Sequence, residues 1–217
     1  SDKMAMSVMD IYKKYKIMPS LQMHMLRVAA VASLICDNFT EPVSKEDIVI
    51  ACLFHDMGNI IKFKMNVLPE FLEPEGLEYW QKVKDEYTEK YGENEHKATM
   101  QIARELNVND RVLNLIEAIS FVGAPHNAAG RDFDKKVVDY ADTRVNPFGV
   151  VSVEQRFLDL RKRYAHHGSD TPERNAYENA LRQIEQQIFA KCKIKPEDIN
   201  NKAITPIILK LKDFVLE

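Results

Sequence analysis

Residues 51–59 read Ala51-Cys52-Leu53-Phe54-His55-Asp56-Met57-Gly58-Asn59. Apolar residues lead into an adjacent His-Asp pair, and a glycine follows shortly after it. We expect a helix that ends at this pair. Neighbouring side chains on a helix point about 100° apart, but at its C-terminus both can turn toward one ion. An imidazole beside a carboxylate suits Mn, Fe, Co, Ni or Zn better than Ca, which prefers all-oxygen sites.

The apolar spacing upstream of this stretch predicts a helix as well. Apolar residues recur there every three or four positions, namely Leu21, Met25, Val28, Ala29, Ala32 and Ile35. Pro19 and Ser20 precede them, where a helix start tolerates proline and favours a capping hydroxyl. The chain has only seven glycines in 217 residues, and sheet proteins usually need more for their turns. An all-α fold is therefore expected.

The remaining pattern extends this expectation along the chain. Helices are predicted over residues 44–56, 77–91, 95–106, 110–120, 134–144, 153–164, 172–191 and 205–214. Ser44 would cap the first of these, with Asp47 in capping-box position. The clearest breaks, residues 122–132 and 165–171, are too short to be interdomain linkers. Residues 1–217 are thus expected to form a single domain, a helical bundle.

Two more residues are candidate ligands for the same ion. His24 lies inside the upstream apolar helix, and antiparallel packing of two helices joined by a short loop would bring it near His55. Asp142 ends a mostly apolar run, where an ionised carboxylate is costly unless it is paired or bound to metal. Asp139, three residues earlier on the same helix face, is the alternative ligand or a partner that orients a ligand.

In this order the residues resemble the HD superfamily of metal-dependent phosphohydrolases. Residues 24–29 are similar to the family's H-x-x-R-V-A helix, residues 53–59 to its L-L-H-D-x-G-K, and residues 140–142 to its closing x-A-D. The resemblance covers about residues 20–156. It implies an all-α domain of HD type whose metal ligands are His24, His55, Asp56 and Asp142, with C-terminal helices over residues 157–217 packed on that core.

The resemblance also implies a second metal, and the position of His126 in a loop predicts that this metal binds more weakly. Glu95 and His96 open a stretch similar to the third motif of members that bind two ions. His126 would supply a fourth histidine, although it comes a few residues late and lies in a Gly/Pro loop. Asp56 would then bridge the two ions. The expected cofactor is one or two divalent ions, Mn, Fe, Co, Ni, Mg or Zn.

The substrate-binding cations follow from the same comparison. Asn59 stands where the family often has lysine, and Lys62 could replace that charge. Arg27, Lys97 and Arg144 are further candidates for holding phosphate oxygens. Asp56 is a candidate acceptor for a proton from the attacking water. Arg156 and the basic residues 161–163 are instead expected to form a solvated face, and His166 and His167 a solvated loop.

The implied activity is hydrolysis of a phosphate ester or anhydride, in a nucleotide or other small phosphorylated metabolite, by metal-activated water. Two alternatives stay open. One is an HD-like di-iron oxygenase, which a six-ligand site with His96 and His126 would permit. The other is a non-catalytic signalling or nucleic-acid-binding module.

The composition limits the expected binding partners and the expected cellular compartment. A formal net charge of −3 argues against general nucleic-acid binding. Three widely spaced cysteines without a CxxC pattern argue against a disulfide framework and favour the cytoplasm. No run of about 18 apolar residues and no secretory signal pattern is found, so no membrane association is expected. A homo-oligomer is compatible with the sequence.

Overall fold

The computed structural model describes residues 5–66, 68–163 and 171–217. These residues form helices joined by short connections, with two small antiparallel strand pairs, β1 with β4 and β2 with β3. The elements are, in chain order, β1 Met6–Ser7, α1 Val8–Lys14, α2 Pro19–Asn38, α3 Lys45–Phe54, η1 Asn59–Lys62, η2 Pro69–Phe71, α4 Leu77–Tyr91, α5 Glu95–Glu105, α6 Asp110–Ala118, α7 Ala124–Ala129, α8 Phe133–Thr143, β2 Val145–Asn146, β3 Gly149–Val150, α9 Val153–Arg163, α10 Pro172–Phe189, η4 Pro196–Asp198, α11 Asn201–Lys212 and β4 Val215–Leu216. The predicted all-α class is confirmed.

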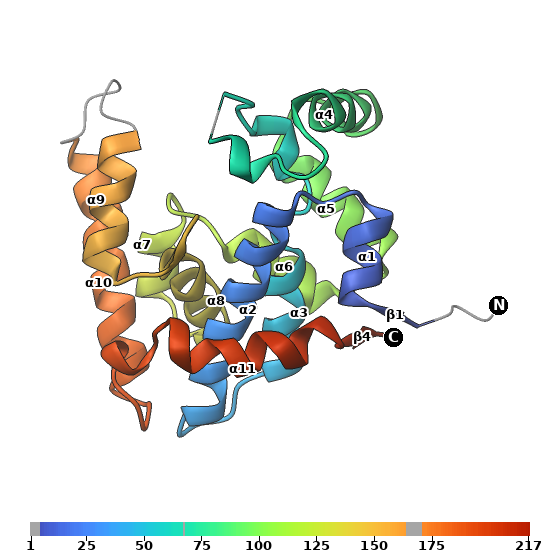
Figure 1. Cartoon of the computed structure of the whole chain (residues 1–217). Coiled ribbons are helices and arrows are strands. Elements are labelled where there is room, and N and C mark those ends of the chain that lie inside the picture. Colours follow the sequence, from blue (N-terminus) through green and yellow to red (C-terminus); the bar gives the residue numbers. More distant parts are fainter. Residues whose placement is uncertain (1–4, 67, 164–170) are drawn as a thin grey trace.

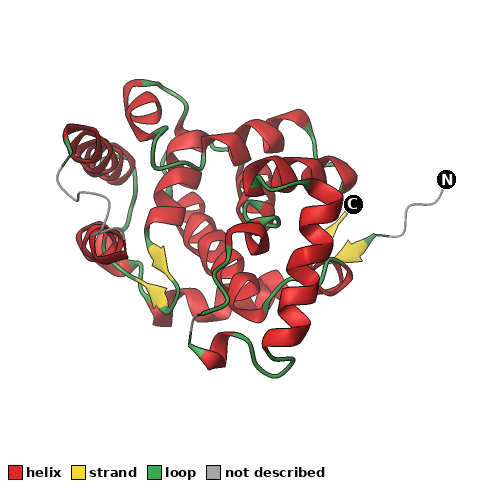
Figure 2. Ribbon diagram, turned by 90° about the horizontal axis from the view of Figure 1, so that it is seen from above, coloured by secondary structure: helices red, strands yellow, loops and turns green. Residues whose placement is uncertain are grey.

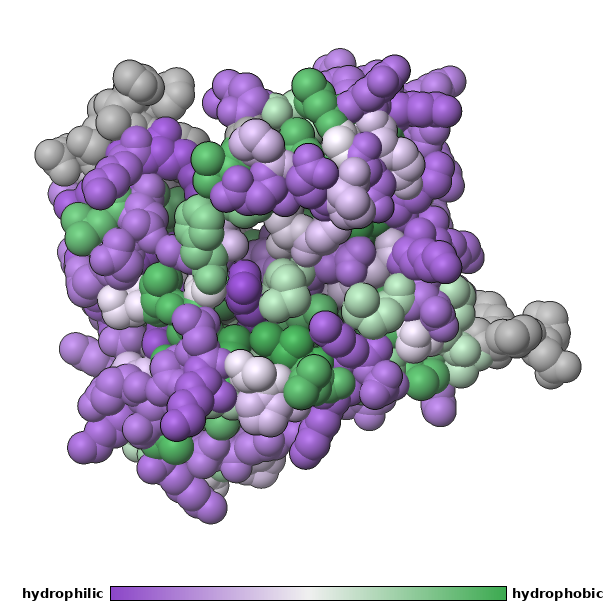
Figure 3. Space-filling model, viewed as in Figure 1, coloured by the Kyte–Doolittle hydropathy of each residue, from purple (hydrophilic) through white to green (hydrophobic). Residues whose placement is uncertain are grey.

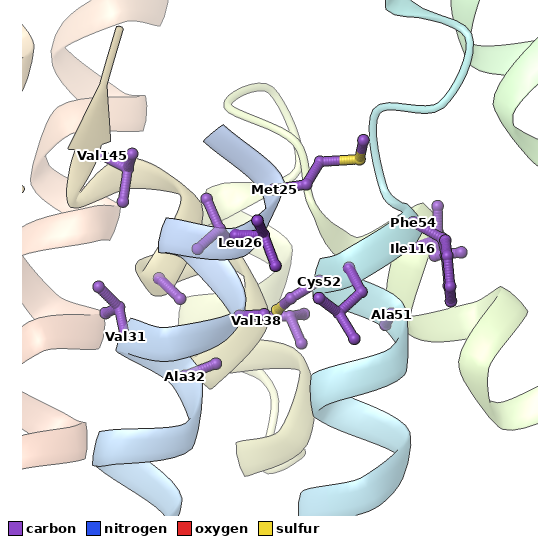
Figure 4. Close-up of a cluster of buried hydrophobic side chains, with 14 of the residues drawn as sticks. Met25, Leu26, Val31, Ala32, Ala51, Cys52, Phe54, Ile116, Val138 and Val145 are labelled. Atoms are coloured by element: carbon purple, nitrogen blue, oxygen red, sulfur yellow. The ribbon is translucent and has the colours of Figure 1, made fainter. Parts of the chain in front are cut away.

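Helix α2 is the centre of the packing (Figure 1). It contacts α3, α8 and α11, and α3 in turn contacts α6 and α8. Figure 4 shows the apolar side chains that meet between these helices, among them Leu26 from α2, Cys52 from α3 and Val138 from α8, all essentially solvent-free. Burial of this apolar surface is the main stabilising term, and it fixes how α2, α3 and α8 approach one another.

Helix α2 is also the one helix of the described residues that is long and apolar enough to cross a membrane. The sequence-based expectation had found no such stretch. However, 56% of its most apolar window is buried inside the fold, against α3, α8 and α11. Core packing therefore accounts for its apolar character.

One predicted helix cap is wrong, and the other is confirmed in its position only. Helix α2 begins at Pro19 with Met18 as its N-cap, so Ser20 lies inside the helix. Ser44 is at the N-cap of α3, but its side chain makes no capping hydrogen bond. Its backbone N–H instead donates to Asp134 Oδ1 at 3.1 Å. That carboxylate joins the start of α3 to the start of α8 and replaces the expected capping box.

Several short elements were not predicted. Helix α7 falls in the expected break 122–132, and α1 precedes the first expected helix. Tyr12 of α1 is fully buried, and its hydroxyl donates to the carbonyl of Leu53 at 2.6 Å. Helix α1 thus satisfies a backbone acceptor at the end of α3. Of the expected break 165–171, only Thr171 is described, so His166 and His167 lie outside the described residues.

The two strand pairs lie at opposite sides of the helices (Figure 2). The β1–β4 pair joins the two ends of the described chain. The β2–β3 pair connects α8 to α9 and contacts α2. This hairpin matters for function because it directly follows the helix that carries Asp142.

Candidate metal centre

The four predicted ligands come together where α2, α3 and α8 meet. One ligand atom from each of His24, His55, Asp56 and Asp142 lies within 4.8 Å of the others. His24 Nε2 is 3.1 Å from Asp142 Oδ1 and 3.3 Å from Asp56 Oδ2. His55 Nε2 is 3.1 Å and 3.2 Å from the same two oxygens. Two imidazoles and two carboxylates thus surround one small volume.

The backbone explains why adjacent residues can share this volume. His55 is the C-cap of α3, and Asp56 lies in the turn that follows. Gly58 sets the path of that turn, because a Cβ there would lie 2.6 Å from the carbonyl oxygen of Glu95 and 2.7 Å from Ala98 Cβ. Its N–H donates to Thr99 Oγ1 at 2.9 Å. Because the residue at position 58 has no side chain, α5 can pack directly against the turn that contains Asp56 and hold it in place.

The hydrogen bonds of His55 prepare it for a cation. Its Nδ1 lies 2.6 Å from the carbonyl oxygen of Cys52, and a carbonyl can only accept, so Nδ1 carries the proton. With a metal ion bound, the ring would be neutral and its Nε2 lone pair would point at the ion between the two carboxylate oxygens. Nε2 lies 3.1–3.2 Å from the oxygens of Asp142 and Asp56. Nitrogen and oxygen lone pairs at this distance repel one another unless a proton or a cation lies between them. The donor set fits a divalent metal ion.

The burial of the cluster differs from one side to the other. The side chain of His55 is 2% exposed, whereas those of Asp56 and Asp142 are 22% and 29% exposed. An ion held here would be closed off on the side of His55 and accessible beside the carboxylates. Catalytic metal sites differ from structural ones in keeping such an open position.

The charges within the cluster stabilise one another. Burial alone would lower the pKa of His55, but the Asp56 charge and hydrogen bonding with Asp142 raise it well above its usual value. The pKa of His24 is raised against burial by the same two carboxylates. Burial would raise the pKa of Asp56, yet the two histidines hold it well below its usual range. The carboxylates are therefore ionised and ready to bind a cation.

Geometry favours Asp142 over Asp139 as the candidate ligand. Asp142 belongs to the cluster. Asp139 is 2% exposed, and its oxygens accept from the backbone N–H of Ser120 at 3.2 Å and from Asn127 Nδ2 at 3.0 Å. Burial raises the pKa of Asp139 to about 8. Its contacts tie α8 to α7 rather than to the candidate ligands.

The predicted second metal site is not formed by the described residues, because their group of close donors contains neither His96 nor His126. His96 Nε2 lies 3.0 Å from Glu117 Oε2, and the two side chains are 48% and 54% exposed. His126 is exposed on α7. The buried residues of α5, such as Ala98 and Thr99, pack toward Gly58, and His96 is left on the exposed side. Among the described residues, the donors close to Asp56 are thus His24, His55 and Asp142.

The predicted phosphate-binding cations differ in their burial and in their hydrogen-bond partners. Arg144 is 3% exposed, and its guanidinium donates to the carbonyls of Val151 and Ile199 and to the Tyr140 hydroxyl. These hydrogen bonds use Arg144 to connect α8 with the residues after β3 and the residues before α11. The predicted role of Arg144 in phosphate binding is therefore wrong. Lys62 and Lys97 are exposed. Arg27 is half-buried, one turn beyond His24, and contacts the Pro147 carbonyl at 3.4 Å.

One residue near the cluster was not predicted to belong to it. Arg156 was expected on a solvated face, but it is half-buried, and the charges of Asp142 and Asp56 act on its guanidinium. Val153 and Phe157 mark the buried side of α9. The spacing of three from Val153 to Arg156 was the available signal, since residues three apart share a helix face.

Comparison with known proteins agrees with this geometry. The model of the HD domain family matches residues 22–145, more than half of the chain, and the match contains His24, His55, Asp56 and Asp142. No match was found among curated proteins or among solved structures. The family generally includes metal-dependent phosphohydrolases. The matched segment and the His/Asp cluster within it identify the chain as a member of the HD domain family.

Proposed function

We propose that this protein is a metal-dependent phosphohydrolase acting on a nucleotide or another small phosphorylated metabolite. The observation that carries the proposal is the orientation of His55. Its Nδ1 proton is held by the Cys52 carbonyl, so its Nε2 joins His24, Asp56 and Asp142 as a ligand. A divalent ion bound there would lower the pKa of water and neutralise charge on phosphoryl oxygens.

Residues of the chain would bind the metal ion and orient the substrate phosphate. His24, His55, Asp56 and Asp142 would hold the ion. The oxygen of Asp56 that does not bind the ion is the candidate acceptor for a proton from the attacking water. Arg27, on α2 beyond His24, is a cation that could orient the phosphate. Lys62, exposed at the end of η1, is a second candidate for contacting the phosphate. The exposed side of the two carboxylates is where the substrate would enter.

No observation favours the di-iron oxygenase alternative. That chemistry would use His96 and His126 as additional ligands, and neither belongs to the cluster of the described residues. A mononuclear site supports hydrolysis better than dioxygen activation by two irons.

The experiment combines elemental analysis with a substrate panel. Purified protein is analysed for transition metals and then assayed with nucleoside mono-, di- and triphosphates and p-nitrophenyl phosphate, with Mn²⁺ or Mg²⁺ added. About one metal per chain and release of phosphate from at least one substrate are expected. The Asp142→Asn variant should contain less metal and release less phosphate than wild type. Metal-free protein that stays inactive after addition of each ion would contradict the proposal.

We further propose a cytoplasmic setting. All three cysteines are free, and Cys52 is buried in the core beside the site. Free thiols persist in a reducing compartment. Small-molecule substrates, without membranes or nucleic acid, are the partners that this proposal requires.

A further inference from the structure

Arg156 lies outside the matched HD segment, and its positive charge interacts with the carboxylates of the His/Asp cluster. It lies on α9, whereas the family model ends at residue 145. Helix α9 packs against β2, and β2 directly follows the helix that carries Asp142. Asp142 and Asp56 are among the groups that attract the Arg156 guanidinium. Burial is nevertheless the largest influence on Arg156 and lowers its pKa.

The guanidinium of Arg156 forms no hydrogen bond or ion pair with the described residues. Other arginines nearby are engaged. Arg161, on the same helix, makes two bonds to the buried carboxylate of Glu178, at 3.1 Å and 2.5 Å. Arg182 is paired with Glu154. A half-buried guanidinium with neither water on all sides nor a protein acceptor is costly, which indicates a ligand that completes its hydrogen bonds.

A second arginine contacts the same hairpin. Arg27 of α2 contacts the carbonyl of Pro147, between β2 and β3, while α9 packs on β2. The side chain of Arg27 is half-buried, and burial lowers its pKa. The space-filling view shows a hollow on this face of the molecule, between α9 and the segment that joins α3 to α4 (Figure 3).

The charges in this region define what the site can attract. The carboxylates of Asp56 and Asp142 would balance one divalent ion, and the histidines would be neutral as ligands. Arg27 and Arg156 then leave an excess of positive charge beside the ion, which Asp159 offsets in part. A terminal phosphate near neutral pH carries about two negative charges, whereas an internal phosphodiester carries one.

We propose that Arg156, together with Arg27, forms the anion-binding part of this site and selects substrates with a terminal phosphate over phosphodiesters. The inference rests on the proposed function, because it assigns the group that meets the substrate at the proposed metal. A planar guanidinium can donate two parallel hydrogen bonds to phosphoryl oxygens. The substrate specificity would then come partly from α9, outside the matched segment.

The test measures binding separately from hydrolysis. Mn²⁺-loaded wild type, Arg156→Gln, Arg156→Lys and Arg163→Gln are titrated calorimetrically with inorganic phosphate and with dimethyl phosphate. Arg163 is exposed, seven residues along the same helix, and serves as the matched control. Mn²⁺ affinity and the far-UV signal are recorded for each protein.

Loss of a charged hydrogen-bond donor should weaken phosphate binding by about 10- to 100-fold in Arg156→Gln. The lysine variant should retain part of the affinity, and Arg163→Gln all of it. The ratio of the affinity for phosphate to that for dimethyl phosphate should fall in Arg156→Gln and stay unchanged in Arg163→Gln. Mn²⁺ should remain bound in both variants. If folded, Mn²⁺-loaded Arg156→Gln binds phosphate like wild type, the inference is overturned while the proposed function stands. If wild type binds no metal, the proposed function fails first.

Discussion

The four-residue cluster and the His96–His126 region both come from motifs in the expected order, yet only the cluster assembles. His24, His55 and Asp142 lie on helices that contact one another through the buried core. His96 and His126 lie on exposed surfaces of α5 and α7, and His96 faces the half-exposed Glu117. Motif order alone does not bring ligands together. The helices that carry them must also pack with the ligand-bearing faces inward.

Helix α5, which carries His96, nevertheless supports the structure of the four-residue cluster. Its buried residues form the surface against which Gly58 packs, and Thr99 accepts the Gly58 N–H. The motif that begins at His96 therefore supports the turn after His55 and Asp56 without supplying a ligand. The comparison predicts large effects on metal binding in the cluster and none at His96 or His126.

The largest effect is expected for Asp56→Ala. This change removes a ligand and leaves His24 and His55 with one carboxylate, so most bound metal and all hydrolytic activity should be lost. The helical far-UV signal should persist, because Asp56 lies in a turn rather than in the core. Metal content by elemental analysis and circular dichroism check this. Full metal occupancy in the variant would remove Asp56 from the ligand set.

The next effect compares two aspartates of α8. Asp142→Asn should weaken metal binding by tenfold or more, about 1.4 kcal/mol or above, because Asp142 belongs to the cluster. Asp139→Asn should leave metal affinity close to that of wild type, because Asp139 bonds to Ser120 and Asn127. Calorimetric titration with Mn²⁺ measures both. A greater loss in Asp139→Asn would mean that the helix register at the site is wrong.

Asp139 should also make folding stability depend on pH. Its pKa rises from 3.8 to about 8 on folding, so between these values the unfolded chain loses the proton first. A group with a raised folded-state pKa contributes its stability at low pH and loses it as pH rises. Wild type should lose about 1.4 kcal/mol per pH unit relative to Asp139→Asn within this window. Urea unfolding of both proteins from pH 4 to 8 tests it, and parallel curves would refute it.

A smaller effect is expected for Gly58→Ala. The new Cβ would press against the Glu95 carbonyl and Ala98, and overpacking of this kind costs about 1–3 kcal/mol. The melting temperature should fall, and metal affinity should fall with it as the turn shifts. Gly123→Ala is the matched control, since a Cβ there meets nothing closer than 3.5 Å. Equal melting temperatures for the two variants would show that α5 does not lock the turn.

The smallest effect is expected for His96→Ala and His126→Ala. Both side chains are exposed and lie outside the cluster, so metal stoichiometry and affinity should match wild type within error. A chelator titration followed by metal analysis provides the measurement. Loss of a second, weaker ion in either variant would restore the two-metal prediction made from the motifs.

The comparison also shows what sequence could predict. Apolar spacing predicted most helices, and the residue pattern placed His24, His55, Asp56 and Asp142 as one ligand set. It could not predict α7, because six residues containing a proline resemble a loop until Asn127 is seen bonded to Ala118 and Asp139. It misassigned both arginines for the same reason. Tertiary contacts, which no local pattern encodes, decide that Arg144 donates to two carbonyls and that Arg156 finds no acceptor among the described residues.

The central claim is that one divalent ion binds among His24, His55, Asp56 and Asp142. The most direct measurement is an anomalous difference map from crystals of the Mn²⁺- or Zn²⁺-loaded protein, collected at the metal's absorption edge. The account predicts one strong peak about 2.0–2.2 Å from the two Nε2 atoms and from an oxygen of each carboxylate. A peak beside His96 or His126, or no peak among the four ligands at saturating metal, would contradict it.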